Sequence, residues 1–229
     1  MYKDSHPSLN MKNIFSFALL AAAVSASPSS KDGPSGSCKS TQNANFDDLT
    51  GVPAVQYNQI PVPYKGLKYQ GFNLLVVVKT GVAPGVVPRS GNNYGVSNAV
   101  TRTTGGSPRW TADNPNSAVR RFTPLSFYYG CSIDLQNGVA AAPTACDITI
   151  TGYKEGDKRV ASQTFAFRPA SALSVAQMTK GNFIGSFQEV QYVTVSYTVA
   201  AGSPLNASLV LLMDDIQYAT CSSIGGRDN

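Results

Sequence analysis

Histidine is almost missing from this chain of 229 residues. The one histidine, His6, lies before a predicted signal-peptide cleavage site at Ala26, so we expect the mature chain to contain no imidazole. Ser-His-Asp and Cys-His nucleophile systems need a histidine as general base, and many zinc and copper sites use its nitrogens as ligands. The sequence therefore excludes these reaction and metal classes for the mature protein.

Charged side chains are also scarce, at 14% of residues. A glycosidase that works with two carboxylates stays open as a distant third reading, through Asp134 with Asp147 or Asp157 with Glu189. Only composition suggests these pairs, so we assign no catalytic residue and predict a non-enzymatic protein. The formal net charge is +5, but the basic residues are scattered and form no stripe of the kind that binds nucleic acid.

The sequence lacks an apolar run long enough to span a bilayer as a helix. The run at 14–24 follows Met11 and Lys12 and ends near a small-residue cleavage site, which is typical of a signal peptide over 11–26. We therefore predict a secreted, extracellular protein. The expected segments are a leader with its signal peptide (1–26), a flexible segment (27–44), one domain (45–221) and a tail (222–229).

The four cysteines, Cys38, Cys131, Cys146 and Cys221, include no Cys-x-x-Cys pair, which disfavours redox catalysis and a zinc knuckle. An even number of cysteines in an oxidising compartment implies two disulfides, with three connectivities open. We favour Cys131–Cys146, which closes a turn between two strands, and Cys38–Cys221, which ties the chain ends together. A sequon at Asn206 predicts N-glycosylation of an extracellular loop.

Alternation of apolar and polar residues is the main pattern of the predicted domain. Residues 147–153 and 191–199 alternate cleanly, and the turn at 155–157 joins two strands as a hairpin. Further strands are predicted at 45–49, 67–78, 122–135, 159–168, 182–187 and 207–219. Only residues 170–180 could hold a short helix, since no sustained helical period occurs elsewhere. This pattern predicts an all-β fold, an antiparallel β-sandwich or jelly roll.

Residues 80–121 do not fit the strand pattern, because Gly, Pro, Asn, Ser and Thr dominate them, and a long loop is expected there. Long loops in compact domains are often functional. Sugar-binding surfaces combine exposed aromatic rings with amides and hydroxyls. The candidate ligand-binding residues are Trp110, Tyr94, Asn92 and Asn93. The alternative is that Trp110 anchors the loop and the asparagines satisfy turns.

Both ends of the predicted domain carry an aspartate pair between apolar residues, in the segments NFDDL and LMDDIQY. This pattern resembles the carbohydrate-binding-module class of secreted jelly rolls, and the fold it implies is galactose-binding-like or carbohydrate-binding-module-like. The resemblance implies that the two ends meet and hold a structural calcium ion, with Asp47, Asp48, Asp214 and Asp215 as oxygen ligands. The alternative is that one aspartate of each pair caps a turn or faces water. No cofactor beyond this ion is expected.

Three further segments, VPYKGLKYQGF, GNF and VQYV, are similar to a family of small secreted proteins of filamentous fungi. The resemblance implies an effector or virulence-associated protein that binds a host protein at the host–fungus interface. The alternative is a lectin-like module that binds cell-wall polysaccharide through the loops around Trp110. We expect a monomer with no nucleic-acid partner and no membrane span.

Overall fold

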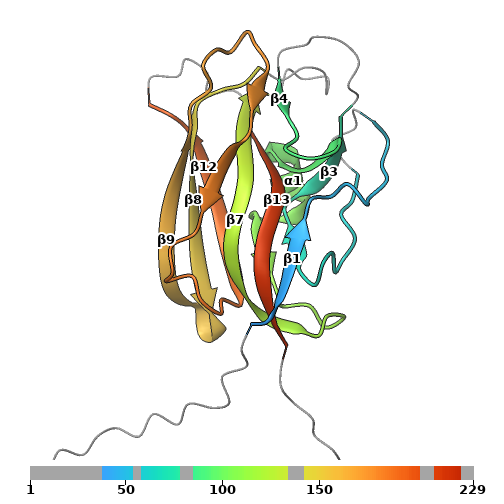
Figure 1. Ribbon diagram of the computed structural model, residues 1–229, viewed down its shortest axis with the longest axis vertical. Coiled ribbons are helices and arrows are strands. Elements are labelled where there is room, and N and C mark those ends of the chain that lie inside the picture. The colour runs from blue at the N-terminus through green and yellow to red at the C-terminus, as the bar shows by residue number, and fades with distance from the viewer. Residues whose placement is uncertain (1–37, 54–57, 78–84, 134–141, 202–208, 223–229) are drawn as a thin grey trace, which may run out of the picture. The chain divides into compact units, whose positions relative to one another are not determined.

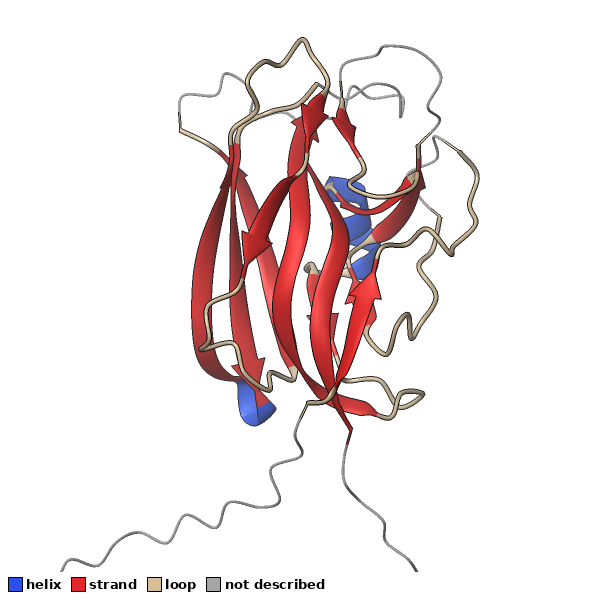
Figure 2. Cartoon of the chain, in the orientation of Figure 1, coloured by secondary structure: helices blue, strands red, loops and turns tan. Residues whose placement is uncertain are grey.

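The structure is a computed structural model that describes residues 38–53, 58–77, 85–133, 142–201 and 209–222. These residues all belong to one compact unit, and most of their regular structure is β-sheet (Figure 2). The described elements are β1 (Ser40–Ala44), β2 (Lys68–Gln70), β3 (Asn73–Val76), β4 (Val86–Val87), β5 (Asn93–Ser97), α1 (Ala99–Gly105), β6 (Arg109–Thr111), β7 (Val119–Ile133), β8 (Cys146–Lys154), η1 (Glu155–Asp157), β9 (Lys158–Phe167), β10 (Ala176–Gln177), β11 (Thr179–Asn182), β12 (Tyr192–Val199) and β13 (Leu209–Ser222). Among the described residues, no helix is long and apolar enough to cross a membrane.

The strands form two antiparallel sheets that pack face to face, which confirms the predicted β-sandwich. One sheet has the order β2-β6-β12-β8-β9, and the other has the order β11-β7-β13-β5-β3 with β1 also paired to β13. Figure 1 shows β9, β8 and β12 side by side in one layer and β7, β13 and β1 in the other. A short parallel pair, β4 with β10, lies outside both sheets.

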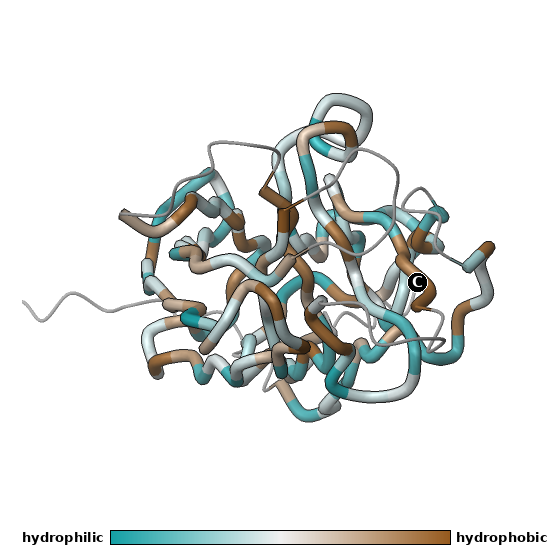
Figure 3. The backbone as a smooth tube through the Cα atoms, turned by 90° about the horizontal axis from the view of Figure 1, so that it is seen from above, coloured by the Kyte–Doolittle hydropathy of each residue, from teal (hydrophilic) through white to brown (hydrophobic). Residues whose placement is uncertain are grey.

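Period-2 alternation explains why β8 and β12 form the middle of the five-stranded sheet. Ile148 and Ile150 of β8 are buried, whereas Thr149 between them is half-buried on the opposite face. Val193 and Val195 repeat this pattern on β12. Figure 3 shows hydrophobic and hydrophilic stretches interspersed along the backbone of the described residues. Each strand thus gives one face to the core and the other to solvent.

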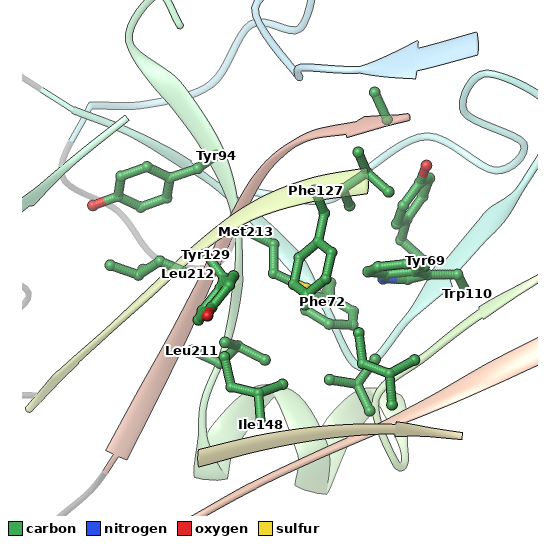
Figure 4. Close-up of a cluster of buried hydrophobic side chains, with 14 of the residues drawn as sticks. Tyr69, Phe72, Tyr94, Trp110, Phe127, Tyr129, Ile148, Leu211, Leu212 and Met213 are labelled. Carbon is green, nitrogen blue, oxygen red and sulfur yellow. The ribbon is translucent and has the colours of Figure 1, made fainter. Parts of the chain in front are cut away.

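Aromatic rings from both sheets fill the space between them. Phe127 of β7 lies 4.9 Å from Phe165 of β9 and 5.9 Å from Trp110 of β6, measured between ring centroids. Both contacts are edge-to-face, the geometry that the ring quadrupoles favour. Figure 4 shows Phe127 and Trp110 within the same cluster of buried side chains. The five-stranded sheet is therefore held against its partner by its inner face.

Two disulfides confirm the predicted pairing. Cys131–Cys146 joins β7 to β8, and Cys38–Cys221 joins the chain just before β1 to β13. The strands β1 and β13 also pair directly, although they lie at opposite ends of the sequence (Figure 1). The two ends of the domain therefore meet, as the resemblance implied.

The predicted boundaries near the first strand are wrong. Part of the segment 27–44, expected to be flexible, forms β1, because its backbone pairs with β13. The expected strand at 45–49 is a turn instead. Phe46 has a left-handed φ of 62°, and the Leu49 amide donates to the Phe46 carbonyl. The ring of Phe46 is buried, so core packing has replaced the strand that its sequence pattern suggested.

The expected long loop at 80–121 is also wrong, and residues 170–180, which could have held a short helix, contain strands. The first region contains β4, β5, α1 and β6, and α1 begins at a capping box between Asn98 and Thr101. The second contains β10 and the start of β11. Strand β11 ends at Asn182, so most of the strand expected at 182–187 is absent. Pairing with strands distant in sequence forms β5 and β11.

Candidate functional site: the outer face of the five-stranded sheet

The outer face of the five-stranded sheet carries aromatic and cationic side chains in register. Tyr192 of β12 has Tyr153 of β8 and Thr111 of β6 as its neighbours across the strands. The row continues to Arg159 of β9 beside Tyr153 and to Lys68 of β2 beside Thr111. Side chains directly opposite one another in an antiparallel pair project to the same face. These five residues therefore form one row across the sheet.

Two tyrosines of this row stack on each other. The rings of Tyr153 and Tyr192 lie 4.7 Å apart between centroids and 13° from parallel, and both side chains are half-buried. Burial and the hydrogen bond that the Tyr192 hydroxyl donates to Asp157, at 2.6 Å, raise the pKa of Tyr192 to about 12. Tyr192 therefore stays a neutral donor at physiological pH. Within the described chain, Tyr192 is the only ring stacked on Tyr153, which leaves the second face of Tyr153 without an aromatic partner.

Arg109 extends the stack to a third strand. Its guanidinium carbon lies 5.0 Å from the centroid of the Tyr192 ring. Its Nε is buried, and neither this nitrogen nor the terminal ones have a hydrogen-bond or ion-pair partner among the described residues. Tyr153, Tyr192 and Arg109 thus form a continuous ridge over β8, β12 and β6. We refer to these three side chains as the ridge.

A strip of hydroxyl groups lies beside the ridge on the same face. Thr149 and Thr164 hydrogen-bond at 3.0 Å, as do Thr151 and Ser162. Thr194 lies between Thr151 and Arg109 in register. Each hydroxyl has both a donor and acceptor capacity, and one hydrogen bond does not exhaust it. The face therefore offers polar groups next to apolar ring surface.

Trp110 does not have the exposed position predicted for it. Its side chain is fully buried, because β6 places Trp110 on the inner face and its neighbours Arg109 and Thr111 on the outer face. Figure 4 shows Trp110 within the core cluster near Phe127. An enclosed ring cannot pack against a sugar, so the prediction of a binding platform at Trp110 is wrong. The weighed alternative, a tryptophan that anchors the structure, describes what is observed.

The other three predicted ligand-binding residues lie away from the ridge. Tyr94 is buried, and burial raises the pKa of its hydroxyl. The buried amide of Asn93 donates to the carbonyls of Phe46 and Leu49 and so satisfies a turn. Asn92 is exposed, and its backbone amide donates to Asp47. Tyr94 and Asn93 therefore have structural positions, and the prediction that they form an open platform is wrong.

The sequence contained a signal for the ridge, namely the alternation of apolar and polar residues in β8 and β12. The prediction did not use it, because the composition of residues 80–121 suggested a binding loop there. Ile148 and Ile150 place even-numbered residues of β8 inside, so Tyr153 falls on the outer face. Val193 likewise places Tyr192 outside. What the sequence did not contain is the neighbour relation of β6, β8 and β12, which are far apart along the chain. The ridge needs all three strands.

Three of the four predicted calcium ligands approach one another around Ser90. Asp47 accepts a hydrogen bond from the Ser90 hydroxyl, at 3.0 Å, and Asp214 accepts one from its amide, at 3.0 Å. Asp215 also accepts from the Ser90 hydroxyl, at 3.3 Å. Gly91 has a left-handed φ, and any side chain there would collide with the Asp47 carboxylate. The glycine thus permits this close approach.

The carboxylate of Asp214 is the most buried of the three. Burial raises the pKa of Asp214 to about 7, and the nearby charges of Asp215 and Asp47 add to the rise. The amides of Ser90 and Asp215 donate to it and partly offset this cost. Carboxylates held together in this way repel one another.

Asp48 lies in a different network, so the structure brings together only three of the four predicted calcium ligands. It accepts hydrogen bonds from the Tyr64 hydroxyl and from Lys65, each at 2.6 Å, and both lower the pKa of Asp48. In the described parts of the chain, no group of three or more His, Cys, Asp or Glu side chains is arranged to hold a metal ion. The calcium site stays a prediction, now restricted to Asp47, Asp214 and Asp215.

The carboxylates considered for glycosidase chemistry have other partners. Asp157 accepts from Tyr192, and Glu189 forms an ion pair with Arg121 at 2.9 Å. Asp147 forms an ion pair with Arg168, at 2.6 Å. Asp134, the sequon at Asn206, the leader and the tail after Ser222 lie outside the described residues. We therefore assign no catalytic pair.

Comparison with known proteins supports the fold and leaves the family open. No protein-family model matches the chain, and no curated protein matches it in sequence. A DUF4465 family protein from Bacteroides caccae is similar in structure, with a TM-score of 0.50 and 13% identity, over 80% of this chain and 100% of the other. At this identity the likeness shows the fold alone.

Two further solved structures match more weakly. The arabinose-bound MgGH51 α-L-arabinofuranosidase has a TM-score of 0.39 and 11% identity, over 78% of this chain and 26% of the other. The CBM22-1 xylan-binding domain of Paenibacillus barcinonensis Xyn10C has a TM-score of 0.33 and 11% identity, over 80% and 94%. Neither likeness carries a functional argument. The function must be inferred from the geometry of this chain.

Proposed function

We propose that the protein is a secreted, non-enzymatic carbohydrate-binding module whose binding surface is the outer face of the five-stranded sheet. The observation that carries the proposal is the ridge with its adjoining hydroxyl strip. An aromatic ring packs against the C–H face of a sugar while nearby polar groups meet the sugar hydroxyls. Tyr153 supplies the ring face that has no aromatic partner in the described chain, and Thr151 and Ser162 lie next to it.

The ridge is well suited to binding because it is ordered before a ligand arrives. Tyr192 is held by Asp157 and lies between Tyr153 and Arg109. A side chain that is already fixed loses little conformational entropy on binding, so more of the contact energy remains as affinity. The two disulfides agree with a protein that works in an oxidising, extracellular environment.

The proposal differs from the leading expectation drawn from the sequence. Neither the described structure nor the comparisons contain a feature that favours an effector acting on a host protein. The open sheet face favours the lectin-like alternative, but at the ridge and not at the loops around Trp110. A glycosidase keeps no candidate pair among the described residues, since Asp157 and Glu189 are engaged elsewhere.

Retention of the purified protein on insoluble polysaccharides tests the proposal. We expect saturable retention on at least one of chitin, β-glucan, cellulose, xylan and pectin, and about tenfold weaker binding for Tyr153→Ala, which corresponds to about 1.4 kcal/mol. Tyr128→Ala is the matched control, because Tyr128 is a half-buried tyrosine on the other sheet with Arg89 over its ring. No retention of the wild-type protein, or an equal loss in Tyr128→Ala, would contradict the proposal.

A further inference from the structure

We propose that the ridge selects glycans that carry carboxylates, such as uronic-acid polymers. This inference rests on the proposed function and adds the class of ligand. Three cations lie in or beside the row of residues that contains Tyr153 and Tyr192, which we call the tyrosine row. Arg159 on β9 and Lys68 on β2 are its two ends, and Arg109 on β6 lies beside it. They lie on both sides of Tyr153 and Tyr192 in the register of the sheet.

The positive charge of these side chains is not neutralised within the described chain. The ion pairs of the described residues join Lys65 to Asp48, Arg121 to Glu189 and Arg168 to Asp147, and none of them includes the three cations of the tyrosine row.

The acidic residues near the face offset these cations only in part. Asp147 belongs to the ion pair with Arg168, but Asp157 is bound only to the neutral Tyr192 hydroxyl, and Glu155 is exposed in the turn between β8 and β9, so two carboxylates stand against three cations. Basic groups without ion-pair partners beside a sugar-binding surface attract an anionic ligand.

Arg109 has the geometry that recognises a carboxylate. Its guanidinium carbon lies over the Tyr192 ring, 5.0 Å from the centroid, and no ion pair of the described residues includes it. A planar guanidinium donates two parallel hydrogen bonds to a carboxylate, which a lysine ammonium cannot do. An arginine that is already stacked needs little further ordering to bind in this way.

The spacing of the cations suits a polymer that lies across the strands. Arg159 and Lys68 are separated by four strand-to-strand steps, or roughly 19 Å at the usual spacing of paired strands. A chain of several sugars laid across this distance passes over Arg159, the ridge and Lys68 in turn. Carboxylates repeated along such a polymer would meet more than one of these cations.

The test compares polymers that differ only in their carboxylates. Binding is measured for polygalacturonate, alginate and hyaluronan, each against its carboxyl-reduced form, and for dextran sulfate. We expect at least tenfold tighter binding of one acidic polymer than of its reduced form at low salt, and a smaller difference at high salt because ions screen the charges. Arg109→Gln should lose most of the preference for the acidic polymer while still binding the reduced form. Arg109→Lys should lose nearly as much of this preference, because a lysine ammonium cannot donate two parallel hydrogen bonds.

The matched control removes two cations that surround a tyrosine on the other sheet. Arg89 and Lys180 lie over the Tyr128 ring at 4.9 and 5.9 Å, so the double change to glutamine removes charge without touching the ridge. This variant should keep the preference. Equal binding of acidic and reduced polymers overturns the inference and leaves the proposed function standing, as does an equal loss of preference in the control or tighter binding of dextran sulfate. No binding of any polysaccharide overturns both.

Discussion

Tyr192 shows how a single position combines three interactions on the sheet face. Its ring lies between Tyr153 and Arg109, and its hydroxyl donates to Asp157. Trp110, one strand away, has the opposite role, because it faces the core and packs on Phe127. Residue type alone does not distinguish the two aromatic side chains. The side of the sheet to which each one points does.

The ionisation of Tyr192 provides a test at the residue scale. Burial and Asp157 raise its pKa to about 12, so the stability that its neutral form contributes is complete below the ordinary value near 10 and is lost as the pH rises through about 12. The tyrosinate absorbance of the wild type minus that of Tyr192→Phe should have its midpoint near pH 12. In the Asp157→Asn background the same difference should shift toward pH 10. A midpoint near 10 in the wild type would contradict the described hydrogen bond.

At the scale of elements, the two aspartate pairs indicate that distant segments meet. These segments are the turn after β1, the loop at Ser90 and β13. Pairing of β1 with β13 brings residues from both ends of the domain together. Asp214 then accepts a hydrogen bond from the Ser90 amide and Asp47 accepts one from the Ser90 hydroxyl, whereas Asp48 binds Lys65. Calcium binds oxygen ligands in a flexible geometry, so a cation here would reduce the repulsion between the carboxylates.

Calcium addition after EDTA treatment tests this site. At a concentration about a hundredfold above the dissociation constant, calcium should raise the melting temperature by roughly 5–10 °C, which corresponds to about 2.7 kcal/mol. Asp214→Asn should abolish the shift. Asp48→Asn is the control and should keep it, because Asp48 binds Tyr64 and Lys65. An unchanged melting temperature in the wild type, or an undiminished shift in Asp214→Asn, would remove calcium from this protein.

At the scale of the whole molecule, two disulfides and one sandwich core stabilise the open sheet face. Cys38–Cys221 closes 183 residues of sequence, and Cys131–Cys146 closes 15. A cross-link stabilises chiefly by lowering the entropy of the unfolded chain, and the effect grows slowly with the length of the closed loop. Cys38–Cys221 should therefore contribute more to the free energy of unfolding than Cys131–Cys146.

Paired replacement of the cysteines by serine measures these contributions. We expect the free energy of unfolding to fall by about 3 kcal/mol without Cys131–Cys146 and by about 5 kcal/mol without Cys38–Cys221, on the chain-entropy model. Urea unfolding of the two double variants and the wild type provides the comparison. A larger loss for the shorter link would show that strain or residual structure in the unfolded state, and not loop length, decides the order.

The sequence by itself determined the features that depend on local pattern. Alternation of apolar and polar residues predicted the β-sandwich and the central strands β8 and β12. The even number of cysteines and the two aspartate pairs predicted the disulfides and the meeting of the chain ends. The strands follow from the period of the apolar residues, which any short window of the chain contains. The disulfides and the meeting of the ends follow from the number of cysteines and from two similar segments at the two ends of the domain.

Only the tertiary structure decided which strands are neighbours and therefore which side chains form a site. Residues 80–121 are rich in loop-forming types, yet long-range pairing with β3, β12 and β13 makes strands of several segments there. The same pairing buries Trp110 and sets Arg109 beside Tyr192. Backbone hydrogen bonds between distant segments outweigh local propensity, because strand formation depends on the partner as well as on the sequence.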